Sequence, residues 1–221
     1  DGMNENIDEV FHSSAIGDGA SPKSIPLPKL ARLRDWLKET RPPAFPFPVN
    51  ADLAKAGEPV YARECAACHA FGGERTGKVE PLASVGTDRN RLDMWTKESA
   101  AAYNTYAKDY PWGFKGFRTT DGYVNVPLDG VWIRAPYLHN GSVPTLADLL
   151  EPQEKRPRVF YRGYDVYDPV RGGFVSTGPE AERVGMRYDT AARGNSNAGH
   201  NWGTALSPEE KAALVEYMKT L

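Results

Sequence analysis

The two cysteines of this chain, together with the residue that follows the second, form its most informative pattern. Cys65 and Cys68 are three positions apart, and His69 comes directly after them. This C-x-x-C-H spacing is the attachment signature of c-type haem. Cysteines three positions apart on one helix face can form thioethers with the two vinyl groups of one porphyrin, and the adjacent imidazole can bind its iron. The pattern predicts one covalently attached haem c held by Cys65, Cys68 and His69.

A zinc site and a redox dithiol are the two alternatives for the same residues. A tetrahedral zinc site needs further cysteines or closely spaced histidines, and the sequence offers neither. A thioredoxin-like pair belongs in a β-α-β context, which the flanking segments lack. Haem attachment is therefore favoured. Because thioethers of this kind form outside the cytoplasm, the motif also predicts a periplasmic or otherwise exported protein.

The second axial ligand must come from the remaining histidines and methionines. His200 is preferred because Gly199 and Gly203 flank it, and glycine lets a backbone approach a flat ligand closely. Met186 and His139 remain alternatives, as does an open coordination position. Lower weight falls on residues that suit core packing or lie in a polar N-terminal segment: Met94, Met218, Met3 and His12.

Helical patterns surround the motif. Apolar spacing predicts a short amphipathic helix over 28–39, a helix over 51–64 capped by Asn50, and another over about 89–102. A capping box starts at Thr145, and a second one at Ser207 opens the terminal helix. Residues 109–144 favour packed loop, whereas 1–28 and 152–203 show no clear period. The fold class expected is mainly α: a cytochrome c-like helical core with long irregular loops wrapped around the haem.

One close contact is expected between the helix that enters the motif and the terminal helix. In cytochromes c these two helices cross near the haem edge. A small residue on one and an aromatic residue on the other permit close approach. Gly57 against Tyr217 is the predicted pair.

Composition limits the remaining possibilities. The 221 residues carry a net charge of −2, which argues against nucleic-acid binding. No apolar run approaches the roughly 18 residues of a membrane span. Prolines crowd positions 42–48 and favour an extended strap. This segment predicts a division into an N-terminal arm, residues 1–48, and a haem domain, residues 49–221.

From Cys65 onward the sequence resembles the C-terminal haem domain of the rubber-oxygenase-like c-type cytochromes, relatives of bacterial dihaem cytochrome c peroxidases. The resemblance is carried by residues 65–69, 135–146, 164–169 and 194–200, and by 206–211 after the last of these. In that family two histidines hold the second haem, and the later one resembles His200 in its position before the terminal helix. The oxygen-binding haem belongs to a first haem domain, whose own C-x-x-C-H has no counterpart in this sequence.

The resemblance therefore implies a monohaem electron-transfer cytochrome with iron held by His69 and His200, working with a redox partner protein. A haem peroxidase or dioxygenase with an open iron position is the alternative function. A third possibility is an electron-relay subunit associated with another haem-bearing chain.

Overall fold

The computed structural model describes residues 1–221, and its contacts group them into two units. Unit 1 contains Asp1–Arg41 and Leu92–Tyr123, and unit 2 contains Pro42–Arg91 and Val124–Leu221. The C-x-x-C-H motif and His200 both belong to unit 2. The sequence predicts that residues 1–48 are an arm strapped over the haem core and not an independently folded unit, and this division at residue 48 stays a prediction.

Unit 1 is built from three helices and an aromatic loop. Its helices are α1 (Ile7–Gly17), α2 (Leu27–Glu39) and α6 (Lys97–Thr105). Asn6 caps α1 by accepting the N–H of Glu9, and Thr96 with Ser99 forms a reciprocal capping box at α6. The structure confirms the expected α2, begins α6 later than the sequence pattern suggested, and adds α1, which was not predicted.

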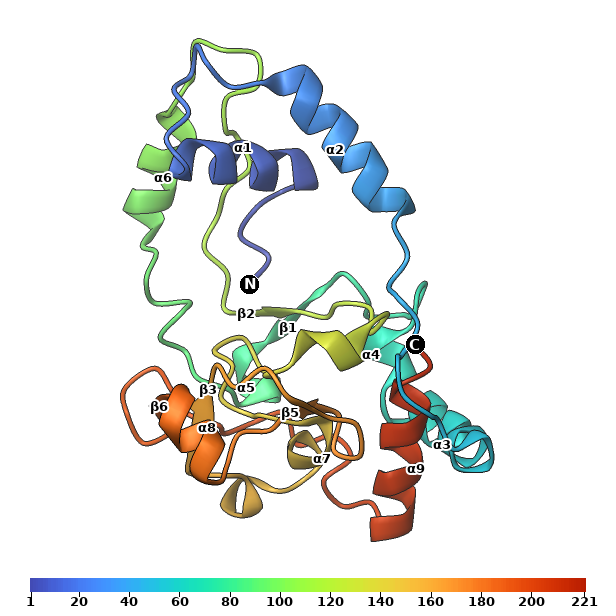
Figure 1. Ribbon diagram of the computed structural model, residues 1–221. Coiled ribbons are helices and arrows are strands. Elements are labelled where there is room, and N and C mark those ends of the chain that lie inside the picture. The colour runs from blue at the N-terminus through green and yellow to red at the C-terminus, as the bar shows by residue number, and fades with distance from the viewer. The chain divides into compact units, whose positions relative to one another are not determined.

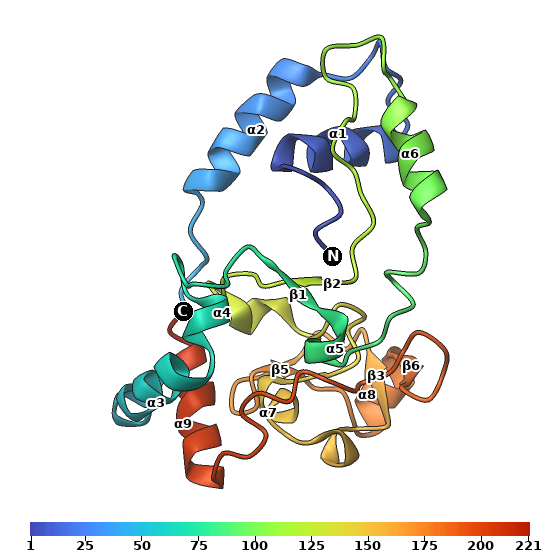
Figure 2. The ribbon, with the colours of Figure 1, turned by 180° about the vertical axis from the view of Figure 1, so that it is seen from behind.

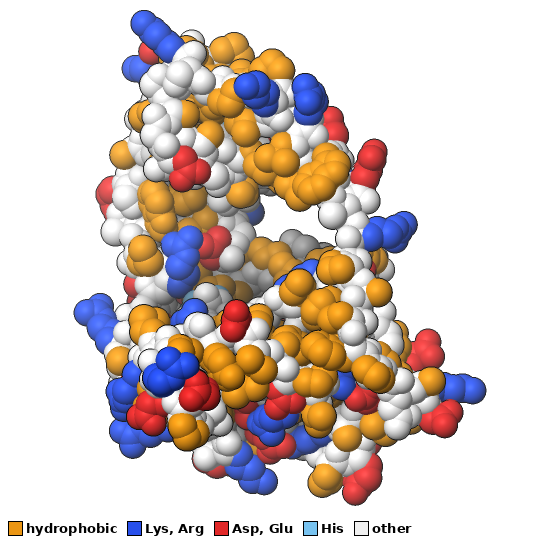
Figure 3. All heavy atoms as spheres, viewed as in Figure 1, with side chains coloured by type: hydrophobic (Ala, Val, Ile, Leu, Met, Phe, Trp, Pro, Cys, Tyr) orange, Lys and Arg blue, Asp and Glu red, His pale blue; other side chains and the backbone are white.

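The apolar side chains of α2 do not form a buried face. None of its residues is buried, and Leu33, Trp36 and Leu37 are 41%, 61% and 40% exposed. Figure 3 shows apolar side chains on the surface over this helix. The helical spacing was therefore a correct guide to secondary structure but not to burial.

In unit 2, α3 (Ala51–Glu64) and α9 (Pro208–Met218) cross in close contact, as both ribbon views show (Figures 1 and 2). A Cβ added at Gly57 would lie 2.0 Å from the Ala213 carbonyl oxygen and 2.8 Å from Cβ of Tyr217. Only glycine permits this approach. The predicted contact between Gly57 and Tyr217 is confirmed.

Both helices begin where the sequence placed their caps. Asn50 accepts the N–H of Leu53, and Ser207 and Glu210 form the expected capping box with Pro208 in the first turn. Helix α3 also continues through Pro59 to Glu64.

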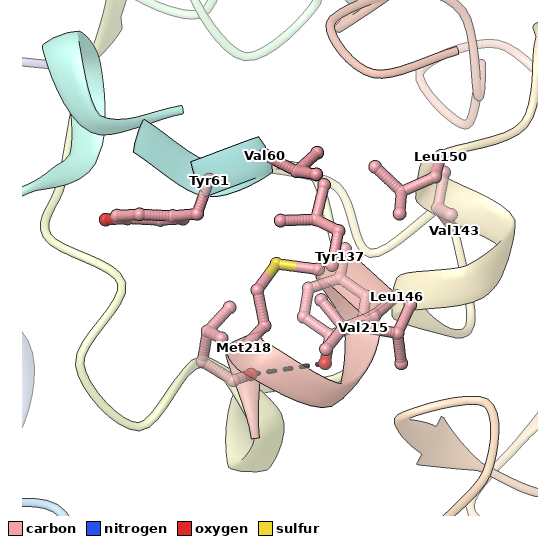
Figure 4. Close-up of a cluster of buried hydrophobic side chains, with 10 residues drawn as sticks. Val60, Tyr61, Tyr137, Val143, Leu146, Leu150, Val215 and Met218 are labelled. Atoms are coloured by element: carbon pink, nitrogen blue, oxygen red, sulfur yellow. Dashed lines mark hydrogen bonds between the residues drawn. The ribbon is translucent and has the colours of Figure 1, made fainter. Parts of the chain in front are cut away.

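The core of unit 2 lies where α3 and α9 meet the segment 131–150 (Figure 4). Its buried members are Val60, Tyr61, Val131, Tyr137, Val143, Leu146, Leu150, Leu214, Val215 and Met218. The Tyr137 hydroxyl, buried among them, donates toward the Val131 carbonyl at 3.1 Å and the Gly172 carbonyl at 3.0 Å. These bonds satisfy a polar group that would otherwise be costly to bury.

The rest of unit 2 consists of short elements joined by loops. Around the motif lie α4 (Ala66–His69), β1 (Val79–Pro81) and α5 (Leu82–Val85), and the chain passes from unit 1 to unit 2 at β2 (Gly122–Val124). The 3₁₀ turns are Val131–Arg134 and Gln153–Lys155, with α7 (Leu146–Leu149) between them. None of the helices combines the length and the apolar character of a membrane-spanning segment.

The segment 152–203 folds into two antiparallel strand pairs and one helix. Strand β3 (Val159–Arg162) pairs with β6 (Met186–Asp189), so that Phe160 lies opposite Tyr188. Strand β4 (Tyr167–Asp168) pairs with β5 (Gly173–Phe174), and α8 (Pro179–Val184) precedes β6. The sequence shows no clear period in this segment and did not predict these strands.

The expected fold class, a mainly α cytochrome c-like core, is wrong. Helices hold 38% of the residues and strands 10%, and the remainder is loop. In unit 2 only α3 and α9 exceed six residues. The reason is that 18 prolines and 21 glycines break the chain into short elements, which pair as small sheets where aromatic residues favour strand.

The proline-rich strap of residues 42–48 is extended and packs within unit 2. The Phe45 ring meets Trp132 edge-on at 5.4 Å, and the Phe47 ring stacks on Tyr167 at 5.9 Å. Gly130 lies under the start of the strap, where a Cβ would be 2.6 Å from Cβ of Pro42. The aromatic contacts fix the strap onto the unit that carries the haem motif.

Candidate haem site

The C-x-x-C-H motif starts a new helical turn at the end of α3. The N–H of Cys65 donates to the Tyr61 carbonyl and ends α3, while the Cys65 carbonyl accepts the N–H groups of Cys68 and His69 and opens α4. Both cysteines are free thiols and half-buried. The motif thus presents two unpaired thiols and an imidazole from one turn of backbone.

One ring nitrogen of His69 is fixed by a backbone carbonyl. Its Nδ1 lies 2.7 Å from the Val126 carbonyl oxygen. Because a carbonyl can only accept, Nδ1 carries the proton in this bond and Nε2 keeps its lone pair. The pKa of His69 lies below its ordinary value because the ring is buried, although the bond to Val126 opposes this shift. A neutral imidazole with a fixed tautomer is the form that binds iron.

His200 is held by the backbone around it. Its N–H donates to the Val85 carbonyl at 2.7 Å, next to a very close approach of two backbone segments of the chain. A Cβ added at Gly199, where φ is +80°, would lie 2.3 Å from the Gly86 carbonyl carbon. His200 itself has a φ of +50°, a conformation that few non-glycine residues adopt. The end of α5 and the glycine of the loop together determine where the His200 ring lies.

His69 and His200 lie far apart in the sequence, in different segments of unit 2, and the fold brings their rings close together. Their ring centroids are 6.2 Å apart and the ring planes are inclined by 40°. Two metal–imidazole bonds of about 2.0–2.1 Å, plus the distance from each nitrogen to its ring centre, add up to a similar separation. The two rings are too far apart for direct contact and at a distance that suits one shared metal ion.

The polar atoms of His200 support the same interpretation. Its Nδ1 is buried and has no hydrogen-bond partner within the protein. Burial, followed by the proximity of His69, lowers the pKa of His200 to about 4. The ring is therefore neutral at physiological pH and carries an available lone pair. A buried, unsatisfied imidazole beside a second neutral imidazole fits a bound haem iron.

The alternative ligands lie elsewhere in the structure. Met186 is 64% exposed on β6, opposite Arg162, and the side chain of His139 is exposed. Met218 is buried in the core of unit 2, as its helical position indicated. Met94, for which core packing was expected, is instead 70% exposed. In unit 1, Met3 is buried and the His12 ring packs edge-on against Trp112.

Two contributors to the site were not identified from the sequence. The Val126 carbonyl carries no side-chain signal, and a backbone oxygen can be assigned only from the fold. The guanidinium of Arg156 binds the loop of His200. In the sequence, nothing distinguishes this buried arginine from the exposed Arg158 two positions later. Neither assignment could have been made from residue type and spacing.

A comparison with known families bears on the segment that supplies Val126, His139 and Arg156. Residues 122–161 match the family described as RoxA-like, cytochrome c-like. This segment of the chain is RoxA-like. The resemblance to rubber-oxygenase-like cytochromes is confirmed there, and the match to this cytochrome c-like family implies haem c as the cofactor. The relation to dihaem peroxidases stays a prediction.

Two relatives of the chain come from Sinorhizobium fredii and are described as uncharacterized proteins. The chain is 30% identical to y4iM over 249 aligned positions, which cover 93% of the chain and 56% of y4iM. It is 44% identical to y4iJ over 115 residues, which cover 48% of the chain and 19% of y4iJ. The chain thus spans about half the length of y4iM and about a fifth of the length of y4iJ.

Proposed function

We propose that this chain is a monohaem c-type electron-transfer domain whose iron is bound by His69 and His200. The observation that carries the proposal is the pair of neutral imidazoles with ring centroids 6.2 Å apart. Cys65 and Cys68 would hold the haem covalently, and a bound haem supplies a one-electron redox centre. Two protein ligands leave no iron position for oxygen or peroxide, which favours electron transfer over oxygenase or peroxidase chemistry.

The residues of the chain have separate tasks in this proposal. His69 is held in one tautomer by the Val126 carbonyl, and His200 is held by Val85 and the Gly199 turn. The redox partner would be a separate protein or another haem-bearing chain. Thioether attachment of the haem places the protein in the periplasm or another exported location.

Ferric and ferrous spectra with added carbon monoxide test the proposal on the haem-loaded protein. The wild type is expected to be low-spin and to ignore carbon monoxide. His200→Ala should become high-spin and bind it, whereas His139→Ala, a matched change of an exposed histidine, should behave as the wild type. Two imidazoles should also give a lower reduction potential than a histidine–methionine pair, because methionine raises the potential.

Three results would contradict the proposal in different ways. Loss of colour from the polypeptide on acid-acetone extraction would exclude thioether attachment through Cys65 and Cys68. Rapid carbon monoxide binding by the wild type would favour an enzyme with an open iron position. A sulfur-to-iron charge-transfer band would show that the second ligand is a methionine and not His200, and Met186 would be the first methionine to test.

A further inference from the structure

Arg156 is a buried cation whose hydrogen-bond partners are all backbone carbonyls. The residue is 4% exposed and follows the 3₁₀ turn Gln153–Lys155. Its guanidinium presents five N–H donors in a rigid plane. The acceptors are the carbonyl oxygens of Asn197 at 2.6 Å, Gly199 at 2.8 Å, Glu151 at 2.8 Å, Leu149 at 3.2 Å and His200 at 3.3 Å.

These acceptors come from two separate segments of unit 2. Three of them belong to residues 197–200, the loop that ends in His200, and two lie at the end of α7. Helix α7 is anchored in turn, because Leu146 and Leu150 are members of the buried core. Arg156 therefore connects the backbone of His200 to the buried core of the unit.

The side-chain type matters for this connection. A lysine ammonium has only three donors on a flexible stem and cannot reproduce the planar fork of a guanidinium. An arginine that served only to fill space would not need donors aimed at both segments. The charge also has an effect of its own, since a buried cation interacts more strongly with neighbouring charges than one in water.

We infer that Arg156 is a positioning residue: it fixes the backbone of His200 so that the imidazole faces His69, and its buried charge raises the reduction potential of the bound haem. The inference rests on the proposed function, because it assigns to Arg156 a task that acts through His200. The potential rises because a nearby positive charge favours the iron state that carries the smaller charge.

The test compares haem-loaded wild type, Arg156→Lys, Arg156→Gln and His200→Ala, with Arg158→Lys and Arg158→Gln as matched controls. Arg158 is exposed and two residues away. Replacing Arg156 by Lys keeps the charge and removes the fork. We then expect more of the ferrous haem to bind carbon monoxide. The ratio of haem that binds carbon monoxide to haem that does not should rise about tenfold or more for each charge-assisted hydrogen bond that is lost. The Arg158 variants should match the wild type.

Added imidazole separates positioning from collapse of the site. If Arg156 acts through His200, free imidazole restores the low-spin spectrum of both Arg156 variants, as it does for His200→Ala. Midpoint potentials measured in saturating imidazole then compare haems with the same ligands. Under these conditions Arg156→Gln should have the lower potential of the two, because only this variant lacks the charge. If Arg156→Gln does not fold, Arg156→Lys alone still tests the positioning role.

The outcomes that overturn the inference differ from those that overturn the proposed function. If His200→Ala leaves the spectrum unchanged, His200 is not the ligand, and both the ligand assignment and the role of Arg156 fall. If His200→Ala becomes high-spin while Arg156→Lys remains like the Arg158 controls, the ligand assignment stands and the positioning role is wrong. Equal potentials of the two Arg156 variants in imidazole would contradict the electrostatic role alone.

Discussion

Two buried polar side chains show how partners distinguish a structural residue from a candidate ligand. Glu9 in unit 1 is 6% exposed, and its carboxylate accepts the backbone N–H groups of Glu5, Lys115 and Gly116 at 3.0–3.2 Å. His200 in unit 2 is the opposite case, because its buried Nδ1 has no partner in the protein. A satisfied buried group stabilises the fold, whereas an unsatisfied one needs an explanation, and a bound metal supplies one.

The carboxylate of Glu9 leads to a prediction about acid stability. Burial raises its pKa, but the N–H groups of Gly116, Glu5 and Lys115 outweigh this effect and hold it below the ordinary value of 4.5. Because the pKa of Glu9 is lower in the folded state than in the unfolded state, its ionised carboxylate stabilises the fold. This contribution to the free energy of unfolding is fully present above a pH of about 4.5 and is lost as the pH falls through the folded-state pKa. Glu9→Gln should remove this component and cost about 1–3 kcal/mol at neutral pH.

Denaturant unfolding at several pH values, followed by the fluorescence of the tryptophans, measures this effect. Glu39→Gln is the control, since Glu39 is exposed at the end of α2. The control should retain the wild-type acid dependence. A Glu9→Gln protein with the same stability and the same acid dependence as the wild type would show that the buried carboxylate does not hold unit 1 together.

The site could be predicted from the sequence only as far as side-chain chemistry extends. Cys65, Cys68 and His69 are contiguous, so their spacing indicates their chemistry directly. His200 was selected by its glycine neighbours, and the structure brings its ring to 6.2 Å from that of His69. Val126 and Arg156 act through backbone groups far away in the chain, and no local pattern reports such contacts.

At the scale of elements, the crossing of α3 and α9 depends on one glycine. Gly57→Ala would place a methyl group 2.0 Å from the Ala213 carbonyl oxygen, so one helix must move. Overpacking of this kind costs about 1–3 kcal/mol or more. We expect the variant to unfold at lower denaturant concentration with haem still attached.

Gly17→Ala is the matched control for this change. Gly17 is also helical, at the end of α1, and an added Cβ there meets nothing within 4 Å. This variant should be neutral or slightly more stable, because alanine is the better helix former. Equal stability of the two variants would mean that α3 and α9 do not pack as closely as the structure indicates.

The helices were easier to predict than the strands for a physical reason. A cap such as Asn50 or Ser207 acts on N–H groups two or three residues away, so the sequence alone records it. Strands of two to four residues, such as β4 and β5, are too short for an alternating pattern and exist because a distant segment pairs with them. The mainly α fold class was wrong because it was derived from the helices alone.

At the scale of the whole molecule, the two units are interleaved along the chain. The chain first passes from unit 1 to unit 2 beside the proline-rich segment 42–48, whereas no sequence pattern indicated that residues 92–123 return to unit 1. The contacts that create this unit join residues more than 100 positions apart, as between Glu9 and Gly116. Apolar periodicity carries no information about pairings at such a separation.

This interleaving makes a prediction about cleavage of the strap. A protease site inserted between Pro43 and Pro48 cuts the chain inside unit 2, shortly after the first segment of unit 1 ends at Arg41. Residues 1–41 should nevertheless stay bound after cleavage. The Thr120 hydroxyl donates to the Asp1 carbonyl at 2.5 Å, the N–H of Arg118 to the Met3 carbonyl at 2.9 Å, and Glu9 binds the 115–116 backbone.

Size-exclusion chromatography of the cut protein checks this outcome. The two fragments should elute together in native buffer and separate only in denaturant, and the haem spectrum should be unchanged because the haem motif and His200 lie in unit 2. Glu9→Ala in the same cleavable background should weaken the association, since it leaves three backbone N–H groups without their acceptor. Release of residues 1–41 from the otherwise wild-type cut protein under native conditions would show that unit 1 is not held by its pairing with residues 92–123, and it would also contradict the predicted single domain in which residues 1–48 are an arm strapped over the haem core.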